Sequence, residues 1–214
     1  EIYYDITGDP HTHNGKECSI ENDCGRIAEI WNLVFTQYDR RGGGKLVPLE
    51  KKNIDTGMGL ERLACVMQVK KTNFEIDTLR PINEAVREAL GGVAWGPASH
   101  VYAITDHVRA SVFSITDGVI PSNEGRGYVI RKLIRRALWR AHLLLNSPEA
   151  KKPRQLEEPF LFQLVSPVVD AMKTAYPELA EAQLAVREAL KGEEERFLMT
   201  LESGSRILED RLSK

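Results

Sequence analysis

The sequence predicts an α+β protein in which a sheet is followed by helices. Before residue 60, short runs rich in β-branched and aromatic residues alternate with polar, glycine-containing turns. From Asp77 onward, apolar residues recur at three- and four-residue spacing, which is typical of amphipathic helices. This change of pattern predicts two units, residues 1–78 and residues 79–214.

The composition is that of a globular protein with a packed core. Of the 214 residues, 42% are hydrophobic and 28% are charged, so the chain is too apolar to be disordered. The formal net charge is -2, and contact with nucleic acid would therefore need a local basic patch. No apolar run approaches the roughly 20 residues that span a bilayer, so no membrane partner is expected. Three cysteines are too few for a disulfide framework, which favours a reducing compartment, the cytoplasm.

Two strands and a hairpin partner are expected in the first unit. Residues 2–4 are β-prone, and the polar stretch at 7–24 is typical of a surface loop. The bulky run at 30–35 predicts a second strand, which ends at the charged, glycine-rich turn at 40–44. Residues 46–49 then return as the hairpin partner.

A segment with two glycines leads from the sheet into a helix. Residues 55–62 read DTGMGLER, and two glycines one residue apart allow the backbone to lie close against a ligand. Apolar spacing then predicts a helix over residues 60–68, with Arg62 in its first turn, where a guanidinium can clamp phosphate oxygens. Glycine pairs also occur at such turns for structural reasons, and Asp55 is alternatively the N-cap of this helix.

Five helices are expected in the second unit. Apolar spacing, with glycine and proline between the segments, places them at residues 81–90, 99–114, 126–145, 160–175 and 178–212. The last helix carries a narrow apolar stripe with near-heptad spacing, which favours packing on its own bundle. The stripe consists of Val186, Leu190, Phe197, Leu201, Leu208 and Leu212.

The helix expected at 126–145 carries six basic residues and no acidic ones between its first residue and Arg140. A run of charge is usually a solvated face, but this density also suits RNA phosphates. Asn123 precedes the helix and is either a turn residue after Pro121 or an amide that reads a base-pair edge. The six basic residues are Arg126, Arg131, Lys132, Arg135, Arg136 and Arg140.

Several of these segments together resemble the alanine-specific class II aminoacyl-tRNA synthetases. Residues 55–63 (DTGMGLERL) are similar to motif 3 of that family, and residues 29–35 (EIWNLVF) resemble the strand before it. Residues 121–132 (PSNEGRGYVIRK), with TDHVR at 105–109 before them, look like the start of the family's helical tRNA-binding domain. The resemblance implies part of the class II antiparallel sheet with the motif 3 helix, followed by an all-α domain. It also implies ligation of alanine to tRNA(Ala) with ATP.

The resemblance implies a pocket for alanine on the sheet. Asp55 would hold the ammonium group, Asn32 and Val34 would line the pocket, and Gly57 would form its floor. Strand alternation agrees, because it places Asn32 and Val34 on one face. Asn32 and Asp55 must then converge, so a strand over residues 29–37 should pair with a strand over residues 49–56. A methyl pocket discriminates weakly, so a separate editing activity is expected, and this chain shows none of it.

The resemblance further implies an ATP site. Arg62 would contact the terminal phosphates, with Gly57 and Gly59 beneath the nucleotide, so Arg62 and Asp55 are the expected catalytic residues. Glu29 resembles the acidic residue that holds Mg²⁺ with ATP in other class II enzymes. Strict alternation points Glu29 away from Asn32, so this role needs a strand bulge, and a surface role is the alternative.

For the tRNA, the resemblance implies contact with the acceptor stem. Asn123 would read its wobble G·U pair, and the six basic residues would contact the RNA. Zinc is not expected in this segment. His11, His13, Cys18 and Cys24 share one loop, but their spacing fits no common zinc pattern, and whether they bind a metal stays open.

Motifs 1 and 2 of the class II active site are not found in this sequence, which begins after the position where they would end. We therefore expect the activity to belong to a longer polypeptide and this chain to be inactive alone. Two other classes of function stay open. A non-catalytic tRNA-binding module would not bind ATP, and a helical scaffold for assembly would not bind tRNA in a salt-sensitive way.

Overall fold

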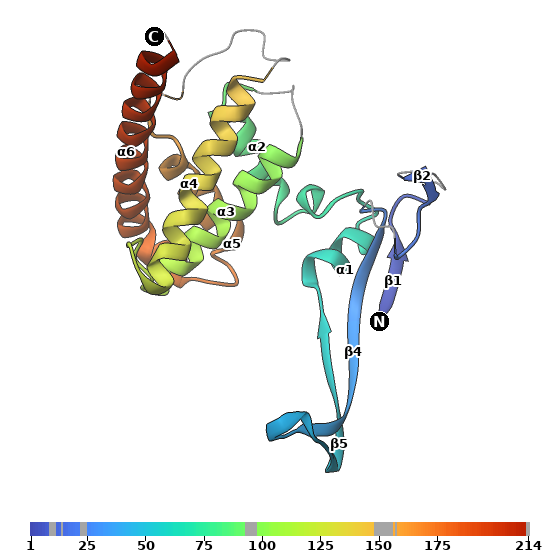
Figure 1. Ribbon diagram of the computed structural model, residues 1–214. Coiled ribbons are helices and arrows are strands. Elements are labelled where there is room, and N and C mark those ends of the chain that lie inside the picture. Colours follow the sequence, from blue (N-terminus) through green and yellow to red (C-terminus); the bar gives the residue numbers. More distant parts are fainter. Residues whose placement is uncertain are drawn as a thin grey trace. The chain divides into compact units, whose positions relative to one another are not determined.

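A computed structural model of the chain describes residues 1–8, 12–13, 15–21, 25–92, 98–147, 156 and 158–212. The contacts between residues divide the chain into two compact units, Glu1–Ile76 and Asp77–Lys214 (Figure 1). The division falls two residues before the end of the first unit expected from the sequence.

A three-stranded antiparallel sheet forms most of the first unit. Its strand order is β1–β4–β5, with β1 at Ile2–Asp5, β4 at Ile27–Arg40 and β5 at Leu46–Met58. The turn η1 (Gly42–Gly44) connects β4 to β5, and Gly43 and Gly44 have φ values of 74° and 79°, which glycine adopts without steric cost. A second, two-stranded ladder pairs β2 (Thr12–His13) with β3 (Lys16–Glu17).

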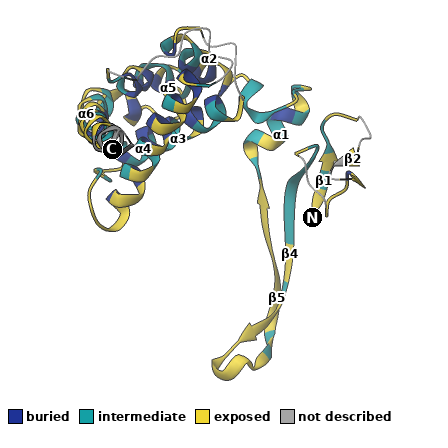
Figure 2. Ribbon diagram, turned by 45° about the horizontal axis from the view of Figure 1, so that its top comes forward, coloured by how far each residue is buried: buried dark blue, intermediate teal, exposed yellow. Residues whose placement is uncertain are grey.

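The β4–β5 hairpin is longer than the apolar pattern predicts. The expected pairing of residues 29–37 with residues 49–56 is confirmed, but β4 continues three residues further, to Arg40, and β5 continues two residues further, to Met58. Most of β5 and the distal half of β4 are exposed (Figure 2), with Phe35 64% and Ile54 57% exposed. Backbone hydrogen bonds hold the exposed ends of these strands. Because their side chains are not buried, the sequence shows no alternation of apolar and polar residues there.

A short helix, α1 (Leu60–Met67), follows the hairpin. Gly59 is its N-cap residue and makes no side-chain capping hydrogen bond. Asp55 lies within β5, four residues before Gly59, so the alternative role of Asp55 as the N-cap is wrong. The 3-10 turn η2 (Asn73–Glu75) comes next and packs against α1.

All the elements described in the second unit are helical. Each helix expected from the sequence is present, although the one expected at 160–175 divides into η3 and α5. The helices α3 and α4 pack on each other, and α6 lies along both (Figure 1). The elements are α2 (Arg80–Ala89), α3 (Ala98–Thr116), α4 (Gly125–Leu145), η3 (Leu161–Leu164), α5 (Val165–Met172) and α6 (Glu178–Leu212).

An aliphatic core holds the second unit together. Ile104, Ile134, Leu138 and Leu190 are at most 1% exposed, and burial of each such side chain stabilises the fold by about 1.5–3 kcal/mol. The apolar stripe of α6 is buried at Val186 and Leu190 and only half-buried at Phe197 and Leu201. The side chains of Leu208 and Leu212 lie outside the described residues.

The described helices include none with the length and apolarity needed to cross a membrane.

Candidate functional site

The β4–β5 register brings the four residues of the expected alanine pocket onto one face of the hairpin. Asn32 pairs with Gly57, and Val34 pairs with Asp55. Directly opposed residues of an antiparallel pair share a face, as do alternate residues along a strand. A Cβ added to Gly57 would meet no atom within 4 Å, so the space beside this glycine is open. The carboxylate of Asp55 is exposed on the same face.

Hydrogen bonds on the opposite side of the hairpin fix this register. The indole Nε1 of Trp31 donates to the Thr56 hydroxyl, which donates to the Asn32 carbonyl oxygen at 3.2 Å. Side chains of both strands therefore hold the backbone of Asn32 in place.

A bulge in β4 changes the orientation expected for Glu29. On β1, Ile2 pairs with Trp31 and Tyr3 pairs with Glu29, so Ile30 is one extra residue on β4. An extra residue reverses the alternation of side chains, and Glu29 therefore lies on the same face as Asn32. The Asn32 Nδ2 donates to Glu29 Oε1 at 3.1 Å. The strand bulge that the proposed role of Glu29 requires is therefore present.

The first turn of α1 is attached to β4 at this bulge. The Gly59 amide donates to the Ile30 carbonyl at 3.1 Å, and Arg62 Nη1 donates to the Glu29 carbonyl at 2.7 Å. The same Arg62 nitrogen lies 4.0 Å from Glu29 Oε2. A Cβ on Gly59 would come within 3.2 Å of Arg62 Cδ, so glycine at this position leaves room for the arginine to fold back towards the strand.

An open cavity of about 510 Å³ lies beside Glu29 and Arg62. Its lining includes a second cation, Lys71, which the sequence does not predict as a ligand because KKTN at 70–73 follows no phosphate-binding pattern. Asn32, Val34, Asp55 and Gly57 do not line it. The lining residues are Tyr3, Ile6, Ile20, Gly25, Ile27, Ala28, Glu29, Arg62, Lys71, Thr72 and Asn73.

The donor set of this cavity fits a nucleotide with its metal better than a resident metal ion. Mg²⁺ in phosphate-binding sites is held by one or two carboxylates together with the phosphates, and Glu29 supplies one carboxylate. Within the described part of the chain, no three His, Cys, Asp or Glu side chains gather as a metal site. Of the loop residues considered for zinc, Cys18 is buried, while His11, Cys24 and the side chain of His13 lie outside the described residues.

The polar group around Glu29 also includes Tyr3 and Glu1. The Tyr3 hydroxyl donates to Glu1, and this hydrogen bond is the main cause that raises the pKa of Tyr3 to about 12. Asn32 Nδ2 also donates to Glu1 Oε1 at 3.2 Å. Glu1, Glu29 and Asn32 therefore place two carboxylates and an amide together at the bulge.

In the second unit, burial divides the six basic residues of α4 into two groups. Arg126, Lys132, Arg136 and Arg140 are exposed. Arg131 and Arg135 are half-buried, and their Nε atoms donate to Oε1 of Glu193 on α6 at 2.9 and 2.7 Å. The charge run in the sequence cannot separate these groups, because Glu193 follows 62 residues after Arg131.

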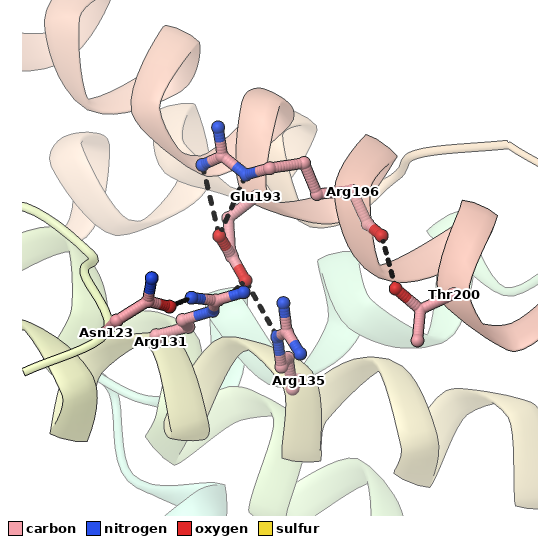
Figure 3. A network of polar contacts seen from close by, with 6 residues as sticks. All are labelled: Asn123, Arg131, Arg135, Glu193, Arg196 and Thr200. Carbon is pink, nitrogen blue, oxygen red and sulfur yellow. Dashed lines mark hydrogen bonds and ion pairs between the residues drawn. The ribbon is translucent and has the colours of Figure 1, made fainter.

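Asn123 lies in the loop before α4 and is exposed. Its Oδ1 accepts a hydrogen bond from Arg131 Nη1 (Figure 3). Gly127 allows this loop to lie against the helix, because a Cβ there would overlap the Ile120 carbonyl oxygen and the Ser122 hydroxyl. The side chain of Asn123 is thus held by a residue two turns along α4.

A groove of about 450 Å³ runs beside Asn123 on this face of α4. Two exposed aromatic rings, Tyr128 (50% exposed) and Trp139 (45%), stand among the cations. Cations suit phosphates, and aromatic rings suit bases and sugars, so the groove has the chemistry of an RNA-binding surface. Neither ring was predicted from the sequence, although their helical spacing places them on the face of Lys132. The lining residues are Asn123, Tyr128, Arg131, Lys132, Arg135, Arg136 and Trp139.

Comparison with known proteins gives consistent matches over the whole chain. The alanine–tRNA ligase of Methylococcus capsulatus is 47% identical over 209 residues, which cover 98% of this chain and 23% of that protein. The alanine–tRNA ligase of Elusimicrobium minutum is 46% identical over 216 residues, covering 100% of this chain and 24% of that protein. The alanine–tRNA ligase of Thermotoga maritima is 43% identical over 218 residues, again covering 100% of this chain and 24% of that protein.

The chain therefore spans about a quarter of the length of these relatives. The family model described as tRNA synthetases class II (A) matches residues 1–214. Because this match covers the entire chain, the protein belongs to the class II (A) family of tRNA synthetases and is similar to alanine–tRNA ligases.

Proposed function

We propose that this chain is the C-terminal half of the aminoacylation core of an alanine–tRNA ligase. The observation that carries the proposal is the hairpin face on which Asn32, Val34, Gly57 and Asp55 lie together, next to the bulge that joins Glu29 to Arg62. The names of the similar proteins support the same activity. The activity of a whole ligase is proposed here for the complete native polypeptide that contains this sequence.

The alanine site would work through charge and size. Asp55 would pair with the ammonium group of alanine, and a charge-assisted hydrogen bond of this kind is about twice as strong as a neutral one. Asn32 and Val34 would border the methyl group, and the missing side chain at Gly57 leaves space for it. The alanine carboxylate would then be free to attack the α-phosphorus of ATP, with pyrophosphate as the leaving group.

The ATP site would use the groups at the bulge. Arg62 would contact the terminal phosphates, with Gly57 and Gly59 close to the nucleotide and Glu29 beside its Mg²⁺. Mg²⁺ bound with ATP neutralises the charge that develops on the phosphates. Because Arg62 already donates to the Glu29 carbonyl, its guanidinium is oriented before the nucleotide arrives.

The second unit would bind the acceptor stem of tRNA(Ala). Asn123 would contact the edge of the G·U pair, and the exposed cations Arg126, Lys132, Arg136 and Arg140 would contact phosphates. Arg131 and Arg135 border the same groove, but each is also bound to Glu193. Both would contact the RNA, and their ion pairs with Glu193 would also hold α4 against α6. The ligase would bind its tRNA in the cytoplasm, without contact with a membrane.

ATP–pyrophosphate exchange by the complete native polypeptide tests the proposed function. Exchange that depends on alanine and falls sharply in the Asp55→Asn variant is the expected result. Normal exchange in the Asp55→Asn variant would show that Asp55 does not bind alanine.

The groove on α4 favours a second function, that of a non-catalytic tRNA-binding module. Such a module would bind tRNA and show neither ATP binding nor alanine-dependent exchange. The same exchange assay, combined with a tRNA-binding measurement, therefore separates the two functions.

A further inference from the structure

A buried carboxylate on α6 connects the loop of Asn123 to the helix bundle. The side chain of Glu193 is only 2% exposed, and both of its oxygens are bonded to arginines (Figure 3). Oε1 accepts from Arg131 Nε at 2.9 Å and from Arg135 Nε at 2.7 Å. Oε2 accepts from Arg196 Nε and Nη2 at 3.1 and 3.0 Å. Three guanidinium groups therefore surround one carboxylate.

This arrangement makes the position of Arg131 well determined. A buried carboxylate is tolerated only with partners, and Glu193 uses four hydrogen bonds to satisfy its two oxygens. The guanidinium is planar and carries its donors in a rigid fork. Once Glu193 holds Nε of Arg131, the direction of Nη1 is restricted as well. Nη1 is the atom that donates to Asn123 Oδ1.

The same contact determines which way the Asn123 amide faces. Arginine has donors and no acceptor, so the Asn123 oxygen must face Arg131. The Asn123 nitrogen then points away from Arg131, as Figure 3 shows. The amide is thereby prepared to donate hydrogen bonds, which suits acceptor atoms on the edge of a base pair.

We propose that Glu193 is a positioning residue for base-pair recognition, acting through Arg131 on Asn123. Glu193 itself is buried and does not need to touch the RNA. This inference rests on the proposed function of Asn123. It assigns to a residue on α6 the orientation of an amide that lies 70 positions earlier in the chain.

The test compares two tRNA substrates in the complete native polypeptide. One is tRNA(Ala) with its G·U pair, and the other has G·C at that pair. The preference for G·U is the ratio of the two kcat/KM values for aminoacylation. Glu193→Gln keeps the size of the side chain but replaces one oxygen with an NH₂ group that faces arginine donors. We expect the preference to fall about tenfold, since one well-made base contact contributes a discrimination of that order.

Glu194→Gln is the matched control. Glu194 is equally buried and adjacent, but its oxygens accept from the backbone amides of residues 160–162 and not from the arginines. This variant should keep the G·U preference even if it lowers thermal stability. A comparable loss of preference in Glu194→Gln would overturn the proposal, because general loosening of α6 would then explain both variants.

The double variant Asn123→Ala/Glu193→Gln separates the inference from the proposed function. If Glu193 acts through Asn123, Glu193→Gln should cause no further loss of preference once Asn123 is alanine. Asn123→Ala with an unchanged preference would mean that the proposed role of Asn123 fails. If Asn123→Ala lowers the preference and Glu193→Gln does not, the positioning role alone fails.

Arg131→Lys covers the case in which Glu193→Gln does not fold. The lysine keeps a positive charge beside Glu193, but its single ammonium group lacks the fork that reaches both Glu193 and Asn123. Its G·U preference should fall as in Glu193→Gln. A wild-type preference in Arg131→Lys, alongside a lowered preference in Asn123→Ala, would overturn the proposal.

Discussion

Asp55 and Arg62 each present one charge to one of the two proposed small substrates. Asp55 is exposed on the face of the hairpin, while Arg62 reaches back to the bulge from the first turn of α1. The two residues therefore act at different points of the site, and their loss should be separable in kinetics.

In the complete native polypeptide, Arg62→Ala should impair the use of ATP and Asp55→Asn should impair the use of alanine. Each substitution removes one charged partner, a loss of about 2–5 kcal/mol if the pair is desolvated when substrate binds. Exchange kinetics at varied ATP and alanine, with tRNA affinity as the control, measure both effects. An equal loss for both substrates would indicate a misfolded turn at Gly57–Gly59.

The two groups of basic residues on α4 should respond differently to neutralisation. Lys132→Ala removes an exposed charge, so it should weaken all tRNAs alike and lower the slope of log K against log salt by about one unit or slightly less. Arg135→Ala also removes a hydrogen bond to the buried Glu193 and should cost about 1.5–3 kcal/mol of stability. Filter binding at several salt concentrations, with thermal unfolding of both variants, tests the distinction. Equal stability of the two variants would contradict the structural role of Arg135.

At the scale of elements, Glu194 of α6 caps the N-terminal end of the 3-10 turn η3. Oε1 of Glu194 accepts from the amides of Phe160 and Leu161 at 2.9 and 2.8 Å, and Oε2 accepts from Phe162 at 2.9 Å. These amides precede or begin η3 and have no partner within that turn. Burial raises the pKa of Glu194 to about 7, although the three amides oppose this by favouring the charged form.

This raised pKa makes the stability of the helical unit depend on pH. Between the ordinary value of 4.5 and about 7, the folded state holds a proton that the unfolded state has released. Stability should therefore fall as pH rises through this window, by at most about 1.4 kcal/mol per pH unit. Glu194→Gln should remove this dependence. The measurement is hydrogen exchange of the α5 and α6 amides at several pH values, corrected for its intrinsic pH dependence. Parallel pH profiles for the wild-type protein and Glu194→Gln would contradict this prediction.

The success of sequence-based prediction also varies from element to element. Helices of the second unit were predictable, because buried residues such as Ile104 and Leu138 recur at helical spacing. The ends of the hairpin strands were less predictable than their pairing, since exposed strand ends place no apolar pattern in the sequence. The bulge at Ile30 depends on pairing with β1, and the roles of Arg131 and Arg135 depend on Glu193. Contacts between distant segments determine both features, and no local pattern records them.

At the scale of the whole molecule, the chain spans about a quarter of its relatives and has two units with separate proposed roles. We predict that the 214-residue chain alone forms no alanyl-adenylate, whereas the complete native polypeptide does. The family resemblance implies that motif 2, which is not found in this sequence, contacts phosphate in the transition state, so the loss should appear in kcat as well as in KM. ATP–pyrophosphate exchange measures it directly, and measurable exchange by the 214-residue chain would refute the prediction.

The extra residue at Ile30 acts on the strand much as a frameshift acts on a reading frame. Upstream of Ile30, Glu29 belongs to one alternating series, and downstream Asn32 and Val34 belong to another. The extra residue places both series on one face of the sheet. Glu29 and Asn32, three residues apart, and Asn32 and Val34, two residues apart, therefore all lie on that face. A search for related sites by strict alternation would discard Glu29, whereas a search that permits one phase change would keep it.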